Sequence, residues 1–107
     1  MAGIADTNTI DVVGQDATGR FLMIMVETRR WGSDPDQGTQ LRQKVNAYAG
    51  FILDGSLARQ HPETLDHPVD IQLDCVEAPS GEFAAITDHA AAKLLKLGIG
   101  FRIHVQQ

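Results

Sequence analysis

Two short stretches of the sequence alternate strictly between apolar and polar residues, and their polar positions carry groups that could do chemistry. In the stretch from Val69 to Cys75 these positions are Asp70, Gln72 and Asp74. In the stretch from Gly100 to Gln107 they are Arg102, His104 and Gln106. Such alternation is typical of a strand with one wet face, so the polar side chains of each stretch share one side of their strand.

If the two strands are neighbours, His104 lies opposite a carboxylate, with Arg102 on the same face. A His–Asp pair beside an arginine can support acid–base catalysis or bind an anion. Asp74, Arg102 and His104 therefore form a candidate site for a small enzyme or a ligand-binding protein. Alternation alone also predicts polar residues here, so a solvated face with cross-strand ion pairs is the more economical interpretation.

The other reactive residue types form no recognised catalytic or metal-binding pattern. His61 and His67 lie in a proline-containing loop with two acidic residues, Glu63 and Asp66. Their spacing matches no defined metal site, so we predict no metal and no cofactor. Cys75, the only cysteine, falls on the inward side of its strand, where we expect an inert thiol. No serine lies in a G-x-S-x-G elbow, and we assign no catalytic residue.

The elements that must position these residues begin with a hairpin and a helix. The β-rich run from Thr9 to Gln15, the turn Asp16–Gly19 and the strand from Arg20 to Trp31 predict an antiparallel hairpin. A cap and a helix-compatible proline at Asp34–Pro35 then start a helix, which Gly55 stops. Its apolar stripe consists of Leu41, Val45, Tyr48 and Ile52.

The rest of the chain adds one more helix between the two alternating strands. Arg59 to Pro68 is expected to be a loop, and a helix capped by Ser80 runs to Gly98. The order β-β-α-β-α-β predicts one domain over residues 1–107, with residues 1–8 frayed. Right-handed crossovers place both helices on one face of a four-stranded mixed sheet. The predicted fold class is an α+β two-layer sandwich, with the strand order still open.

The second strand is apolar on both of its faces, which indicates an additional contact surface. Phe21, Met23 and Met25 share one face, while Leu22, Ile24 and Val26 share the other. The two helices can cover only one face, and monomeric domains rarely leave an aliphatic patch exposed. We expect an interface formed by Val13, Leu22, Ile24 and Val26, through which the chain forms a homodimer or binds another protein. Cover by its own loops or N-terminal residues is the alternative.

Two side chains on the predicted first helix raise a question of hydrogen bonding. Asn46 and Tyr48 place polar atoms beside or on the apolar stripe. If they are buried they need partners, which we expect among the backbone groups of Ile10 to Gly14. Trp31, at the end of the long strand, is expected to pack at the rim of the core.

The hairpin and the first helix also resemble a known family. The resemblance is carried by Asp6-Thr7-Asn8-Thr9-Ile10-Asp11-Val12-Val13-Gly14, Thr18-Gly19, Trp31, Leu41-Arg42-Gln43-Lys44-Val45-Asn46-Ala47-Tyr48, Phe51, Gly55 and Pro62. These residues resemble a family of small uncharacterised bacterial proteins catalogued only as a domain of unknown function, over about the first sixty residues. The C-terminal half is similar only in element order. The resemblance implies a compact α/β domain and supplies no site residues.

Composition and charge exclude several classes of protein. The 107 residues are 43% hydrophobic and 21% charged, which excludes wholesale disorder and suffices for one core. The net charge of −5 disfavours a nucleic-acid partner. No apolar run approaches the roughly 20 residues of a membrane span, and the first ten residues lack the pattern of a secretory signal. We expect a cytoplasmic, non-enzymatic interaction module without a membrane partner.

Overall fold

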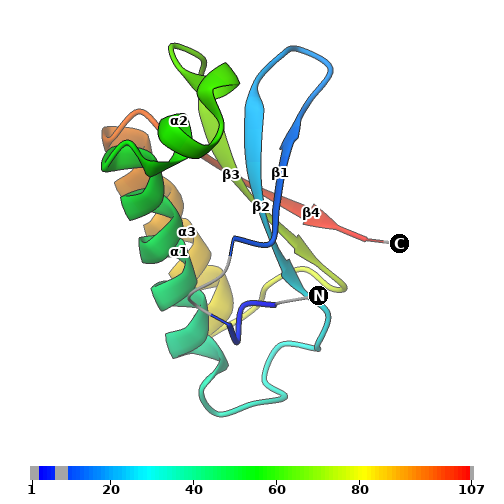
Figure 1. Cartoon of the computed structure of the whole chain (residues 1–107). Coiled ribbons are helices and arrows are strands. Elements are labelled where there is room, and N and C mark those ends of the chain that lie inside the picture. Colours follow the sequence, from blue (N-terminus) through cyan, green and yellow to red (C-terminus); the bar gives the residue numbers. More distant parts are fainter. Residues whose placement is uncertain (1–2, 7–9, 107) are drawn as a thin grey trace.

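The computed structural model confirms a two-layer α+β sandwich (Figure 1). It describes residues 3–6 and 10–106, without the side chain of Val12. The elements are β1 (Val12–Gln15), β2 (Phe21–Glu27), α1 (Gln37–Leu53), α2 (Ser56–Gln60), the 3₁₀ turn η1 (Pro62–Thr64), β3 (Val69–Cys75), α3 (Glu82–Lys96) and β4 (Gly100–Val105). None of the described helices has the length and apolar character needed to cross a membrane.

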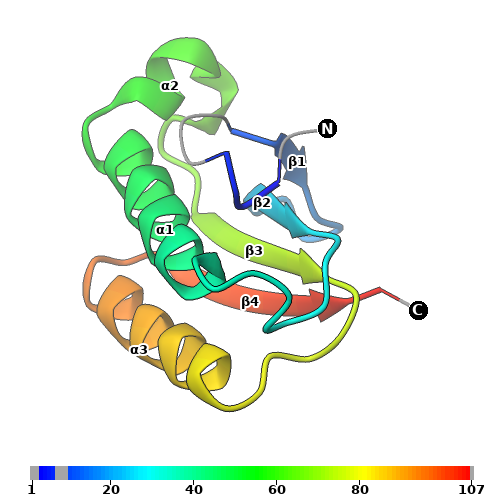
Figure 2. The ribbon, with the colours of Figure 1, turned by 90° about the horizontal axis from the view of Figure 1, so that it is seen from below.

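The strands lie in the order β1-β2-β3-β4, so neighbours in the sheet are also neighbours in the sequence. β1 runs antiparallel to β2, whereas β2, β3 and β4 are parallel. The two parallel connections carry α1 and α3, and both helices cover the same face of the sheet (Figure 2). None of the helices in the described part of the chain lies on the opposite face. This opposite face is called the open face below.

The core lies between the helices and the covered face of the sheet. Met23 and Met25 of β2 and Ile71 and Leu73 of β3 point toward the helices and are fully buried. The predicted stripe of α1 meets them. Its buried members are Leu41, Val45 and Tyr48. The amphipathic patterns therefore assign the covered face correctly, because burial of these aliphatic side chains is the main driving force available.

The elements differ from the predicted ones mainly at their ends. β2 stops at Glu27 rather than Trp31, because the Glu27 carboxylate accepts a hydrogen bond from the Arg29 N–H (2.9 Å) and turns the chain out of the sheet. α1 starts at Gln37, since Asp34 and Pro35 belong to a turn in which the Asp34 side chain accepts from the Asp36 N–H (2.8 Å).

Two further differences concern short elements. The segment expected to be a loop contains α2 and η1, which are too short to show a helical stripe in the sequence. Leu57 of α2 is buried and fixes that helix on the core. At the start of α3, Ser80 contributes its backbone carbonyl to the Phe83 N–H (3.1 Å), and no side-chain cap forms.

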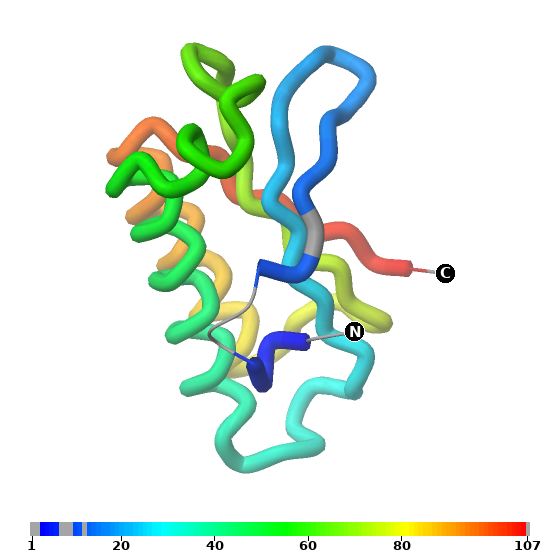
Figure 3. Tube along the Cα trace, viewed as in Figure 1, coloured from blue at the N-terminus to red at the C-terminus, as the bar shows by residue number. Residues whose placement is uncertain are grey.

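The N-terminal segment is docked on the domain, and the predicted fraying is wrong for the part of it that is described. Of the first eight residues the structure describes 3–6, and Ile4 among them is fully buried. Its N–H donates to the carbonyl oxygen of Val26 (3.1 Å). This segment lies between the end of β2 and α1 in the tube view (Figure 3).

A buried ion pair holds this segment and β1 to the first helix. The ammonium of Lys44 donates to the Asp11 carboxylate (2.9 Å) and to the carbonyls of Gly3 (3.1 Å) and Asp6 (2.6 Å). The side chains of Lys44 and Asp11 are both fully buried. The second carboxylate oxygen of Asp11 accepts the Val26 N–H (3.0 Å), which extends the pairing of β2 with the chain before the first residue of β1.

Tyr48, one turn after Lys44, completes the same contact. Its hydroxyl accepts from the Asp11 N–H (2.8 Å) and donates to the Ile24 carbonyl (3.1 Å). The expected partner among Ile10–Gly14 is therefore confirmed for Tyr48, whereas Asn46 is exposed and needs none. Burial raises the pKa of Tyr48, so its hydroxyl stays protonated as the donor to Ile24.

Replacing Lys44 by methionine is expected to be strongly destabilising. Lys44→Met keeps the aliphatic stem but leaves the buried Asp11 carboxylate without its cation, which costs about 3–5 kcal/mol of unfolding free energy. Urea denaturation measures this loss. The matched control is Arg42→Met, at an exposed position of the same helix, which should change stability by about 0.5 kcal/mol or less. Equal effects of the two substitutions would show that the ion pair does not hold the N-terminal segment.

Candidate functional site

The polar positions of β3 and β4 lie side by side on the open face. The register places Asp74 opposite His104, and Gln72 opposite Arg102. The Nδ1 atom of His104 is 3.5 Å from a carboxylate oxygen of Asp74, which also accepts a hydrogen bond from Gln72 (2.7 Å). The structure therefore brings together two of the three predicted site residues, Asp74 and His104.

The third, Arg102, points to a different carboxylate. Its guanidinium lies 2.6 Å from Asp70 and 3.3 Å from Asp16. Arg20 binds the same Asp70 carboxylate through two nitrogens, at 2.9 and 2.6 Å. These four residues are called the Asp70 cluster below. Each of its charges faces an opposite one, so Arg102 is engaged in structure and does not complete the predicted site.

The chemistry of Asp70 follows from its two arginines. Hydrogen bonds from Arg20 and then Arg102 outweigh the effect of partial burial and hold the pKa of Asp70 at about 2. Gly100 lies in register with this residue, and a Cβ atom at position 100 would overlap the Asp70 carboxylate. Position 100 therefore has to be glycine for the cluster to form.

The Asp74–His104 pair itself is open to water. The His104 side chain is 61% exposed. Sites for small molecules usually enclose most of their ligand in a cleft, and a solvated imidazole on a sheet face lacks that enclosure. The geometry agrees with the interpretation of a hydrated outer face with a cross-strand pair.

Of the four hairpin residues proposed as an interface, three lie on the open face as expected and one does not. Leu22, Ile24 and Val26 pair in register with residues of the open face, so they do lie there. Val13 pairs with Met23 and lies on the covered face, packed against the core, so its assignment to the outer face is wrong. The alternation within β1 does not determine which face of the sheet Val13 lies on. A shift of one residue in the register of the hairpin would move every side chain of the strand to the other face.

The hairpin's three aliphatic side chains on the open face are also less accessible than the sequence suggests. Leu22 and Val26 are each only 8% exposed, and Ile24 is half-buried. Leu22 stands in register with Asp70, beside the long side chains of Arg20 and Arg102, and arginine stems commonly cover apolar surface. The hairpin therefore offers little free apolar area.

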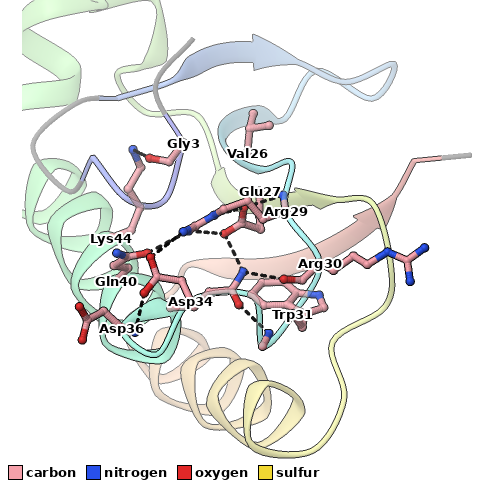
Figure 4. A network of polar contacts seen from close by, with 12 residues as sticks. Gly3, Val26, Glu27, Arg29, Arg30, Trp31, Asp34, Asp36, Gln40 and Lys44 are labelled. Carbon is pink, nitrogen blue, oxygen red and sulfur yellow. Dashed lines mark hydrogen bonds and ion pairs between the residues drawn. The ribbon is translucent and has the colours of Figure 1, made fainter.

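A second polar cluster, not foreseen from the sequence, lies where β2 ends (Figure 4). In open α/β sheets the carboxyl ends of parallel strands are the usual place for a ligand. Glu27 is buried there, and Arg29 binds its carboxylate through Nε (2.9 Å) and Nη2 (2.8 Å). Gln37 donates to the same carboxylate (3.0 Å) and accepts from the Gly32 N–H (2.7 Å).

The hydrogen-bonding groups of this cluster are occupied by contacts within the protein itself. Arg29 also reaches Asp34 (3.2 Å) and Gln40 (2.9 Å), so the loop before α1 is tied to the helix. Although burial opposes ionisation, hydrogen bonds from Arg29 and Gln37 hold the pKa of Glu27 below its usual range. In the described part of the chain no buried side-chain nitrogen or oxygen lacks a hydrogen-bond partner. The sequence signal was a glutamate ending an apolar run, followed two residues later by an arginine.

Trp31 and Cys75 occupy the same end of the sheet and behave as expected. The Trp31 N–H and indole N–H both donate to Glu77 (2.9 Å each), and its ring lies 5.0 Å from that of Phe83. Burial, together with the negative charges of Asp74, Glu27 and Glu77, raises the pKa of Cys75 to about 11. Its thiol is buried and stays protonated at neutral pH, which makes it a poor nucleophile.

The two histidines of the connection before β3 have separate environments. His61 lies 3.2 Å from Glu63, and the His67 ring packs edge-on against Phe21, with 5.5 Å between ring centres. Within residues 3–6 and 10–106 no three metal-binding side chains are grouped as a metal site.

A groove with a volume of about 690 Å³ runs between α1 and α3 on the side away from the sheet. Its floor is formed by the buried core side chains Val45, Ile86, Ala90 and Leu94, and its accessible apolar surface comes mainly from Leu53, Ala85 and Leu97 along the walls. Charged and polar side chains line its mouth, namely Arg42, Asn46, Glu82, His89 and Lys93. The sequence pattern assigned Val45 to the core stripe of the first helix and did not reveal that a groove lies between the two helices.

Comparison with known proteins identifies the family and no function. The family DUF6572, described as a family of unknown function, matches residues 2–107. The match extends the resemblance of the first half to the whole domain. No curated protein and no solved structure matches the chain.

The Asp70 cluster should make stability depend on acid. Asp70 has a pKa of about 2 in the folded protein and about 4 in an unfolded chain, so its stabilisation is present above that unfolded value and is lost as pH falls toward 2. We expect Asp70→Asn to lower the unfolding free energy by about 1–2 kcal/mol near neutral pH. This difference from wild type should shrink steadily between about pH 4 and pH 2, as urea titrations will measure. A difference independent of pH would contradict the ion-pair explanation.

Proposed function

Because this chain belongs to DUF6572, a family of unknown function, we propose its function from its geometry: it is a non-enzymatic interaction module. Its ligand is an acidic amphipathic helix of a partner protein, held in the groove between α1 and α3. The groove, with its apolar walls and cationic mouth, is the observation that carries this proposal.

The shape and lining of the groove suit a helix. Its α1 wall runs from Arg42 to Leu53, which is about 16 Å or three helical turns. Ala49, Gly50 and Ala85 keep the walls low, so that the ridge of a third helix can approach the floor. Leu53 and Leu97 are exposed at one end and extend the apolar surface. Helix-in-groove recognition uses apolar anchors on successive turns in this way.

The charges at the mouth indicate the sign of the partner. Arg42 and Lys93 are cationic, while Glu82 is the one acidic residue among those lining the groove. The chain as a whole carries a net charge of −5, so this cationic mouth differs from the rest of the molecule. Complementary charge speeds encounter and fixes orientation, which favours a partner helix with acidic flanks.

The polar clusters support a role without catalysis. Arg102 and Arg29 are paired with carboxylates of the chain itself, and the Cys75 thiol is buried and protonated. The alternative, an enzyme or ligand-binding protein on the open face, rests on the exposed Asp74–His104 pair alone. Self-association through the hairpin rests on Ile24, because its neighbours Leu22 and Val26 are almost fully covered.

The test is a titration with two synthetic amphipathic peptides. Both carry leucine on one helical face, and their polar face carries either glutamate or lysine. In two-dimensional NMR spectra of the ¹⁵N-labelled protein, the glutamate peptide should shift the amides of Asn46, Gly50 and His89. Binding of the lysine peptide should be weaker by about tenfold or more, because the mouth repels it.

A variant that fills the groove tests whether the peptide binds there. Gly50→Trp should weaken binding of the glutamate peptide by about tenfold or more, and a Cβ atom at position 50 meets no other atom within 4 Å. Ala92→Trp, at an exposed position of α3 outside the groove, is the matched control and should bind as wild type does. Equal binding of both peptides, or none, would overturn the proposal. Binding of dodecanoate without the peptide would replace the partner helix by a small anionic amphiphile.

A further inference from the structure

We propose that β4 pairs with β4 of a second copy of this chain, antiparallel and centred on Ile103, so that two four-stranded sheets join into one. This contact uses the far edge of the sheet and is independent of the groove between α1 and α3. It concerns self-association, whereas the groove concerns a different partner.

The first observation is an unpaired strand edge. β4 is the last strand of the sheet and has a neighbour, β3, on one side only. The Gln106 N–H donates to the Cys75 carbonyl (2.8 Å), which shows that the even-numbered residues of this strand direct their backbone groups toward β3. The backbone groups of Phe101, Ile103 and Val105 therefore point outward. Such a row of free donors and acceptors is a ready template for another strand.

The second observation is that one antiparallel register uses this whole row. With Ile103 opposite Ile103 of the second copy, Phe101 falls opposite Val105 of that copy, and Val105 opposite its Phe101. All these positions have outward backbone groups, so each opposed pair is of the kind that exchanges both N–H···O bonds. A shift by one pairing step in either direction places one of these residues opposite a position outside β4.

The third observation is the side chain at the centre of that register. Ile103 is in register with Leu73 on the covered face, but it is 41% exposed because nothing flanks it beyond the edge. In the paired sheet it would pack against its own copy, and Phe101 against Val105, a combination favoured between neighbouring strands. β4 contains no proline and no lysine, the residues that commonly protect such an edge.

The helix above the edge offers matching surface. A two-fold axis perpendicular to the joined sheet places α3 and α3 of the second copy on the same face, side by side. α3 is the outer helix, on the β4 side of the domain (Figure 2). Its flank opposite the groove is formed by Ala84, Asp88, Ala91 and Leu95, spaced as one helical stripe. Leu95 is 73% exposed, the highest value among the exposed large aliphatic side chains that the structure describes, and it would be covered there.

The test is the solution mass of the full chain, measured by light scattering over a concentration series. We expect wild type to form a dimer that dissociates on dilution, because a strand pair with one helix flank is a contact of modest area. Ile103→Lys should be a monomer throughout that series. Leu65→Lys, at an exposed aliphatic residue far from the edge, is the matched control and should dimerise as wild type does.

Two further variants locate the contact if the edge is not the interface. Ile24→Lys lies on the open face of the hairpin and Gly50→Trp fills the groove, and both should dimerise. Loss of the dimer in either, with retention in Ile103→Lys, would move the interface to that surface and overturn the proposal. A wild-type monomer at every concentration would overturn it as well.

A second measurement covers the possibility that Ile103→Lys fails to fold. Amide hydrogen exchange of wild type should slow at Phe101, Ile103 and Val105 as the protein concentration rises, because their N–H groups become bonded only in the pair. Exchange at these three amides that does not change with concentration would exclude pairing through β4.

Discussion

The buried contact between Lys44 and Asp11 is the interaction on which the N-terminal half of the domain depends. β1 has only four residues, at the short end of the usual range, so it contributes few ladder hydrogen bonds of its own. Asp11 extends that pairing by using its carboxylate, and Lys44 neutralises the carboxylate and gathers the carbonyls of the segment before it. A lone charge in the protein interior is very unfavourable, so the burial of each of these two charges depends on the presence of the other.

In the two other polar clusters, too, the charged and polar groups are paired with one another. The Asp70 cluster ties the hairpin turn to β3 and β4, and the Glu27 cluster ties the end of β2 to α1. The Glu27 cluster occupies the carboxyl end of a parallel strand, where an α/β protein could hold a ligand, whereas the Asp70 cluster lies at the amino ends of β3 and β4. In both clusters the donors and acceptors are already used. What is left for recognition is peripheral: the groove between the helices and the outer edge of the sheet.

The sequence predicted those parts of the fold that follow from periodicity. The stripe of α1 and the alternation of β3 and β4 indicated the elements, and the rule of right-handed crossovers placed the helices on one face. The facing of Val13 was not predictable, because hairpin register depends on a turn whose geometry the alternation does not encode. The partner of Arg102 was not predictable either. Asp70 and Asp74 alternate identically, and Arg20 and Asp16, from the distant turn, decide between them.

The groove escaped prediction for a different reason. A stripe shows which side chains face inward, but it does not show how far apart two neighbouring helices lie. The small residues Ala49, Gly50 and Ala85 form no motif in the sequence, and only their arrangement along facing walls makes them informative.

The burial of Lys44 also separates the lysines of this protein by their chemical reactivity. Lys93 and Lys96 are exposed on the last turn of α3, whereas the Lys44 amine is sealed under the N-terminal segment. Acylating reagents can therefore modify the first two in the native state and reach the third only when the segment lifts or the domain opens. The rate at which the Lys44 amine is labelled therefore measures how often the protein opens.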